Sequence, residues 1–216
     1  VRIMRLAKFT AVSVLALSAA ALTAAPAHAQ EKIKLAASSI SLGYMPVYVA
    51  EAMGYFKQLN LNVERIKANS GPQALTALTT GDFDIVTGNS SNIPNVRKAG
   101  MDLVSIAGLL PQYGGDIVAT KEWAASKGVT KNSPYKDKLQ ILKGATIGVT
   151  GAGGGSDQMT RYIAKEAGLN ADRDMTIIAI PDPAAMQAAF SSNRINVMAQ
   201  SAPTSLKAVE SGGVMV

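Results

Sequence analysis

The sequence contains no cysteine, and its 216 residues include a single histidine, His28. Without cysteine the chain can form no disulfide and no zinc–thiolate site, and it has no thiol nucleophile. His28 lies in an N-terminal segment that we predict to be removed, so the remaining chain would also lack histidine. Ser-His-Asp catalysis and histidine metal ligation are then excluded, and no cofactor is expected.

The N-terminal segment has the three parts of a secretory signal. Arg2, Arg5 and Lys8 precede an apolar run over 9–25, and the small residues around His28 form a cleavage site that ends at Ala29. The alternative is a membrane anchor, but the run is at the short limit for crossing a bilayer. We therefore predict that 1–29 is a signal peptide and that the mature protein is exported to the periplasm.

The charge is small once this segment is set aside. Loss of its three basic residues lowers the formal charge from +6 to +3, and the basic residues that remain form no dense cluster. A nucleic-acid partner is therefore not expected.

Hydrophobic periodicity alternates between the two regular structures along the rest of the chain. Strands are expected over 32–38, 62–68, 84–87, 103–109, 116–120, 146–150, 175–180, 195–199 and from 214. Helices are expected from 46, over 70–81, 92–99, 156–167, 182–192 and 203–210. The mostly polar segment 121–142 is expected to be a surface excursion of one or two short helices, with Trp123 and Tyr135 as apolar anchors. This alternation predicts an α/β protein with mostly parallel sheets.

The two halves of the chain show weak similarity. Residues 48–54 align with 162–168, and 81–86 align with 193–198, each pair in the same order of elements. We predict two α/β lobes, 30–111 and 112–216, with the crossing near 111–115. The similarity is low enough that ordinary α/β regularity is the alternative explanation.

Ligands of such sheets bind beyond the carboxyl ends of the strands, where helix N-termini point. The loops expected there are 38–45, 68–73, 88–91, 150–156, 181–184 and 199–203. They contain no Lys or Arg, and Asp182 is their only acidic residue. Such loops favour recognition of a small anion or zwitterion by backbone N–H groups, hydroxyls and helix dipoles.

The glycine-rich segment 151–156 has three possible interpretations. It nearly matches a dinucleotide fingerprint, with Ser156 in place of the third glycine and Asp182 as the acidic residue. It could also be a purely structural turn. We favour an anion-binding helix N-terminus.

Tyr44 and Tyr113 could each donate a hydrogen bond from the hydroxyl to the ligand or simply pack on their own lobe.

Several short segments together carry a family resemblance. They are 43–50, 54–56, 61–63, the helix at Gly71, 81–85, 141–149 and 185–190. In order and spacing the chain resembles the periplasmic substrate-binding proteins of ABC transporters, of the nitrate/sulfonate/taurine type that includes thiamine-pyrimidine precursor binders. The resemblance implies a two-lobed type II periplasmic-binding-protein fold. It also implies a monomer that clamps a small anion or zwitterion and delivers it to an inner-membrane permease.

The resemblance also implies which residues touch the ligand. In the first lobe they are Ser38, Ser39, Ser41, Gly43, Tyr44, Gly71, Asn89 and Ser90. At the crossing and in the second lobe they are Tyr113, Gly114, Gly154, Gly155, Ser156 and Gln200.

Two departures from the family pattern stand out. Residues 200–203 replace a Trp-x-Pro type motif that many nitrate and sulfonate binders carry. The sequence also stops at Val216, before the return to the first lobe that proteins of this fold make, so the second lobe looks truncated. Two alternative functions remain open, namely an enzyme of pyrimidine or sulfinate chemistry on the same fold and a ligand sensor that docks to a receptor.

Overall fold

The computed structural model describes residues 30–68 and 70–216. The predicted signal peptide, its cleavage site and His28 lie outside the described residues. No helix in the described ranges is long and apolar enough to cross a membrane.

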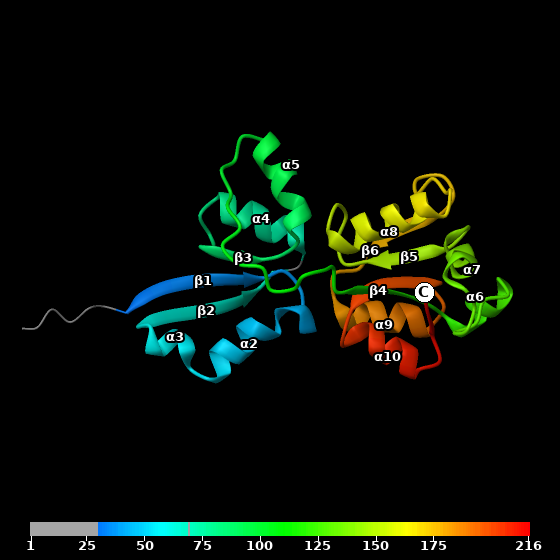
Figure 1. Ribbon diagram of the computed structural model, residues 1–216, viewed down its shortest axis with the longest axis horizontal. Helices are drawn as coiled ribbons and strands as arrows, with labels where there is room; N and C mark the ends of the chain where they lie inside the picture. The colour runs from blue at the N-terminus through cyan, green and yellow to red at the C-terminus, as the bar shows by residue number, and fades with distance from the viewer. Residues whose placement is uncertain (1–29, 69) are drawn as a thin grey trace, which may run out of the picture. The chain divides into compact units, whose positions relative to one another are not determined.

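The first sheet has three strands in the order β2-β1-β3 (Figure 1). They are β1 (Glu31–Ala37), β2 (Leu61–Lys67) and β3 (Ile85–Thr87). β1 and β3 are parallel, with Leu35 opposite Ile85 and Ala37 opposite Thr87. Helices α2 and α3 lie on one side of this sheet, and α4 and α5 lie on the other (Figure 1).

The helical elements of this part begin after β1. They are η1 (Leu42–Tyr44), α2 (Met45–Ala52), α3 (Tyr55–Gln58), α4 (Gly71–Thr79), η2 (Ser90–Asn92) and α5 (Ile93–Lys98). Helix α4 starts where the sequence predicts, because Ser70 caps it by accepting a hydrogen bond from the N–H of Gln73 and proline follows Gly71.

The second sheet has five strands in the order β6-β5-β7-β4-β8. They are β4 (Gly115–Ala119), β5 (Thr146–Val149), β6 (Thr176–Ala179), β7 (Val197–Ser201) and β8 (Val214–Met215). β5 runs parallel to β6 and β7, whereas β4 runs antiparallel to β7 and β8. β4 therefore runs opposite to the other four strands of this sheet, and the mostly parallel arrangement expected from the sequence is confirmed.

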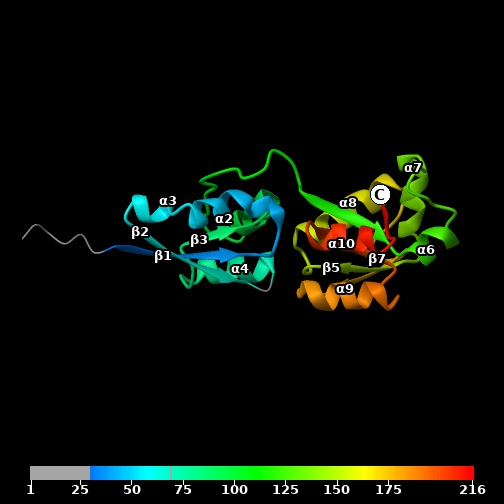
Figure 2. The ribbon, with the colours of Figure 1, turned by 90° about the horizontal axis from the view of Figure 1, so that it is seen from below.

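Helices cover both faces of the second sheet (Figures 1 and 2). They are α6 (Lys121–Ser126), α7 (Tyr135–Lys138), η3 (Leu139–Leu142), α8 (Gly155–Glu166), α9 (Pro183–Ser191) and α10 (Thr204–Glu210). α8 covers one face, and α9 and α10 cover the other (Figures 1 and 2). Successive side chains of β4 point to opposite faces of the sheet. Ile117 packs in the core beneath α8, and Val118 packs with α9 and α10.

Two expectations from the sequence are wrong. The segment 103–109 is not a strand: its apolar residues Val104 and Ile106 are 70% and 71% exposed, and no neighbouring strand pairs with it in the described structure. A strand is stable only within a hydrogen-bonded ladder, so alternation of apolar residues is not sufficient. Tyr135 is not an anchor either, because it is 53% exposed.

The excursion 121–142 contributes to the core more than its composition predicts. Ile141 and Leu142 are fully buried, and the Trp123 indole N–H donates to the Ile141 carbonyl at 2.7 Å. The prediction that Trp123 is an anchor is therefore confirmed.

Candidate functional site

The N-terminus of α8 is the centre of the candidate site. The chain leaves β5 through the glycine-rich loop, in which Gly153 has a φ of 71° and the Gly154 N–H donates to the Gly151 carbonyl at 3.0 Å. The next N–H groups, those of Gly155, Ser156 and Asp157, donate no hydrogen bond to any described residue. These free donors, together with the positive end of the helix dipole, form an arrangement suited to an anion.

The hydroxyl of Ser156 is already used within the loop. Ser156 is 3% exposed, and its Oγ accepts a hydrogen bond from the Thr150 N–H at 2.9 Å and lies 2.9 Å from Thr150 Oγ1. Ser156 therefore offers a ligand its N–H group, while its hydroxyl holds the loop in shape.

A buried carboxylate also lies in the first turn of α8. Asp157 is 4% exposed and accepts from the Gly153 N–H at 2.7 Å and from Arg161 Nε at 2.8 Å. Arg161 also donates to Asp172 at 2.6 Å, and this bond is the largest cause of its raised pKa. The charge of Asp157 is thus balanced by an arginine one turn later. Sequence reasoning missed this pair, although the i,i+4 spacing of Asp157 and Arg161 on a helix predicts it.

Asn89 and Tyr113 lie directly over the start of α8. An ideal Cβ on Gly155 would lie 1.5 Å from Asn89 Nδ2 and 3.0 Å from Tyr113 Cε2, so a larger residue here requires the Asn89 side chain to move. Gly115 makes room for the same ring, since its Cβ would lie 2.3 Å from Tyr113 Cε1. The predicted residues Asn89, Tyr113 and Gly155 are therefore brought together.

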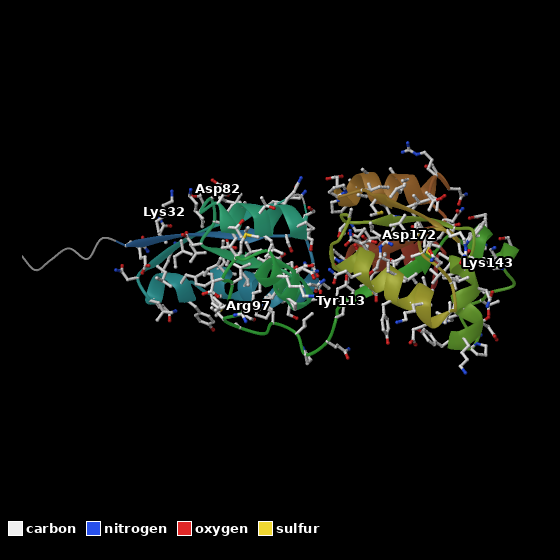
Figure 3. All side chains as sticks on the ribbon, turned by 90° about the horizontal axis from the view of Figure 1, so that it is seen from above. Lys32, Asp82, Arg97, Tyr113, Lys143 and Asp172 are labelled. Carbon is white, nitrogen blue, oxygen red and sulfur yellow. The ribbon has the colours of Figure 1, made fainter. Side chains whose placement is uncertain are left out.

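Tyr113 is a neutral phenol at physiological pH. Burial of its hydroxyl end raises its pKa to about 12, although the residue as a whole is 45% exposed. A hydrogen bond from Asn89 opposes the shift, and the nearby Tyr44 and Asp116 add to it. The hydroxyl proton remains available for donation to a ligand. Tyr113 is labelled in Figure 3, on the segment that leads into β4.

The three serines of the loop after β1 differ in the hydrogen bonds that their hydroxyls form. The buried Ser38 hydroxyl lies 2.8 Å from the Tyr44 hydroxyl. Ser41 is also buried and caps η1 by accepting from the Gly43 N–H at 3.0 Å, which is a structural role. Ser39 is half-buried, with no side-chain hydrogen bond to a described residue.

The remaining predicted residues lie in different surroundings. Gly43 and Gly114 both approach the Leu110 side chain, to which an added Cβ would come within 2.9 Å. Gly71 is the first residue of α4, Ser90 is exposed, and the buried Gly154 precedes α8. Gln200 is 3% exposed and uses Oε1 to accept from the Ser201 N–H at 3.0 Å.

Further contacts link the glycine-rich loop and α8 to the first part of the chain. Gln158 Nε2 donates to Asn92 Oδ1 at 2.7 Å, and an added Cβ on Gly151 would lie 2.8 Å from Ser70 Cβ. Sequence reasoning missed Ser70, Asn92 and Gln158, because uncharged polar residues near helix starts resemble ordinary caps and carry no distinctive spacing.

Asp182 has a structural role that disfavours the dinucleotide interpretation. Its Oδ1 accepts from the Ala185 N–H at 2.9 Å and caps α9, and its Oδ2 lies 3.8 Å from Lys67 Nζ. A ribose ligand would have to displace this cap. Among residues 30–68 and 70–216 no three His, Cys, Asp or Glu side chains are grouped so as to hold a metal ion.

The chain is similar to known proteins over most of its length. The sequence profile of the NMT1-like family matches residues 26–216. YtlA of Bacillus subtilis (strain 168), which is named as a binding protein, is 27% identical over 162 residues, and these cover 74% of this chain and 46% of YtlA.

Two solved structures superpose on this chain and show its fold. The periplasmic nitrate-binding protein NrtA of Synechocystis PCC 6803 superposes with a TM-score of 0.63 at 22% identity, over 85% of this chain and 50% of NrtA. The periplasmic aliphatic sulphonate-binding protein SsuA of Escherichia coli superposes with a TM-score of 0.55 at 23% identity, over 85% of this chain and 58% of SsuA. The type II periplasmic-binding-protein fold expected from the sequence is confirmed, and the chain spans about half the length of these relatives.

Proposed function

Because the chain belongs to the NMT1-like family, we propose that it is the solute-binding part of an ABC importer and clamps a small anion or zwitterion between two lobes, 30–111 and 112–216. The observation that carries the proposal is the start of α8, where the N–H groups of Gly155, Ser156 and Asp157 have no partner among the described residues. Asn89 and Tyr113 face the same point.

In this proposal the anionic group accepts hydrogen bonds from the three free N–H groups. The Tyr113 hydroxyl donates to the same group or to a neighbouring oxygen, since its raised pKa keeps it protonated. Asn89 must turn away from Gly155 to admit the ligand, because its amide lies over this position. Ser38 and Tyr44, which are already hydrogen-bonded to each other, would line the opposite wall.

The ligand class follows from the shortage of charge around these donors. The surrounding loops carry no Lys or Arg, and Asp157 is balanced by Arg161. Backbone donors can hold one negative charge well, but a polyanion needs arginines or lysines. We therefore propose a sulfonate, nitrate, a taurine-like zwitterion or an aromatic carboxylate. The names of NrtA and SsuA support the first two classes.

The cellular setting is part of the same proposal. The 1–29 segment would direct export, the protein would act in the periplasm as a monomer, and a permease of the inner membrane would receive the ligand. We propose binding without catalysis, since the one serine hydroxyl at the start of α8 is engaged by Thr150.

Isothermal titration calorimetry tests this proposal. The protein is titrated with taurine, butanesulfonate, nitrate, benzoate and a pyrimidine, and in parallel with the Gly155→Ala variant, whose methyl group would occupy the space over α8. Gly108→Ala is the matched control, because an added Cβ there meets no atom within 4 Å. We expect one compound to bind the wild type and the control but not Gly155→Ala. Absence of binding by folded wild type, or binding unchanged by Gly155→Ala, would contradict the proposal.

A further inference from the structure

The segment that joins β4 to β5 carries an unbalanced group of lysines. Residues 121–143 include six lysines and two acidic residues, which gives the segment a formal charge of +4. The rest of 30–216 has twelve basic and thirteen acidic residues and so a charge of −1. The positive charge of 30–216 therefore comes entirely from this segment, whose lysines are Lys121, Lys127, Lys131, Lys136, Lys138 and Lys143.

The fold places this segment at the edge of the second sheet that lies away from the candidate anion site. Ala119 at the end of β4 is opposite Val197, the first residue of β7, and Val197 is opposite Ile147 near the start of β5. The segment 121–143 connects these two strand ends, so α6 and α7 lie beyond that edge (Figures 1 and 2). Helix α8 begins at the other end of β5.

Side-chain contacts hold the two ends of the segment together. Lys127 Nζ donates to the Lys143 carbonyl at 2.9 Å and lies 4.5 Å from the centre of the Trp123 ring. The Trp123 N–H donates in turn to the Ile141 carbonyl. Lysines that are 16 positions apart in the sequence are thus neighbours in the structure, and Lys143 is labelled in Figure 3.

These positive charges have little compensation within the protein. None of the six lysines forms an ion pair with another residue of 30–68 or 70–216. Glu122 and Asp137 are the two acidic residues of the segment itself. Asp174 adds a carboxylate near Lys143, but it is paired with Arg173 at 3.1 Å. A surface with such an excess of one charge attracts an anionic partner.

The composition of this surface fits a lipid bilayer better than a protein partner. All basic residues of the segment are lysines, and none is an arginine. Protein–protein interfaces are enriched in arginine and depleted of lysine. An anionic membrane, in contrast, attracts lysines as point charges on flexible stems. Tyr135 is 53% exposed on α7, next to Lys136, and tyrosine is a residue type that favours the membrane–water interface.

We propose that the surface formed by 121–143 docks on an anionic phospholipid bilayer. In this arrangement the lysine ammonium groups lie near the lipid phosphates, and the Tyr135 ring lies at the level of the headgroups. The start of α8 is at the other edge of the sheet, so its N–H donors take no part in the docking. The inference therefore stands independently of the importer proposal.

Co-sedimentation of the full chain with vesicles tests this inference. One set of vesicles contains phosphatidylglycerol and phosphatidylcholine in equal parts, and the other contains phosphatidylcholine alone. Because the predicted signal peptide is itself apolar and basic, all variants keep 1–29, and the ratio of the two partition constants is compared between them. We expect the wild-type ratio to be well above one. It should fall as salt rises from about 0.1 M to about 1 M, which shortens the Debye length from about 10 Å to about 3 Å.

Charge-matched variants assign the binding to this surface. Lys131→Gln/Lys136→Gln neutralises two exposed lysines of the segment, and Lys57→Gln/Lys98→Gln neutralises two exposed lysines elsewhere. Each lysine close to an anionic membrane strengthens binding about fivefold, so the first variant should lower the ratio at least about tenfold. The second variant has the same net charge, and it should lower the ratio less than about threefold because its lysines lie beyond the screening distance.

Three results would overturn the inference. One is a wild-type ratio near one at low salt, and another is a ratio that the two variants lower equally. The third is binding to immobilised poly-L-glutamate without preference for the anionic vesicles, which would assign the surface to an acidic protein instead. Ligand binding measured by calorimetry should be unchanged in Lys131→Gln/Lys136→Gln, so failure here is distinguishable from failure of the importer proposal.

Discussion

Gly155→Ala is the substitution that most sharply tests the geometry over α8. Residue 155 is the first of the helix and has an ordinary backbone conformation, so alanine itself fits the chain there. The difficulty is space, since the new Cβ would lie 1.5 Å from Asn89 Nδ2 and 2.7 Å from Asn89 Cγ.

The size of the effect follows from these distances. Non-bonded heavy atoms are most stable about 3.5 Å apart, so the Asn89 amide must retreat by roughly 2 Å. This movement disturbs the packing over α8 at a cost of about 1–3 kcal/mol. Replacing glycine offsets about 0.4–1 kcal/mol of this by restricting the unfolded chain. We expect a net destabilisation of about 1–2 kcal/mol.

Urea unfolding followed by circular dichroism measures this change, and a double-mutant cycle identifies its cause. Asn89→Ala removes the amide with which the methyl group collides. In that background Gly155→Ala should be neutral or slightly stabilising, which gives a coupling free energy of about 1–3 kcal/mol between the two positions. Equal effects of Gly155→Ala in both backgrounds would refute the proximity of Asn89 and Gly155.

Three more outcomes are expected. Gly148→Ala should lower stability by about 1–3 kcal/mol in urea unfolding, because its Cβ would lie 2.5 Å from a core methionine sulfur, whereas Gly108→Ala should be neutral. Tyr113→Phe should remove the tyrosine that ionises near pH 12 in an absorbance titration at high pH. Since the folded pKa lies above the unfolded value, wild-type stability should fall as pH rises from 10 towards 12, and the variant should lose less. Ser156→Ala should cost about 1–2 kcal/mol because it removes the acceptor of the half-buried Thr150 N–H, but it should change ligand affinity less than about threefold. A large loss of affinity at full stability would show that the Ser156 hydroxyl binds the ligand.

Sequence periodicity predicted the helices and most strands well because their local signals agree with the final packing. α4 and α9 each begin with a capping side chain followed by proline, Ser70 and Asp182 respectively, and both start where these residues predict. Segment 103–109 has the alternation of a strand but lacks a pairing partner, and pairing is a property of the whole fold that no local pattern contains.

The candidate site was predictable in outline and not in detail. Asn89 and Gly155 were expected in loops at the carboxyl ends of strands, and the family resemblance implied Tyr113 at the crossing; the structure brings these three residues together. The sequence could not say that the Ser156 and Ser41 hydroxyls would be used by the backbone, because such bonds depend on side-chain rotamers. Asp157 was overlooked because a charged residue inside a helix usually points to solvent, whereas this one is 4% exposed.

Backbone amide chemical shifts measured during ligand titration test the proposed anion site most directly. A ¹⁵N-labelled protein is titrated with the sulfonate, nitrate or carboxylate that calorimetry identifies, and amide resonances are followed by NMR. We predict saturable downfield shifts of the Gly155, Ser156 and Asp157 N–H protons with a common dissociation constant, because these three donors have no other partner among the described residues. Saturable binding that leaves these three resonances unmoved would contradict the site at the start of α8.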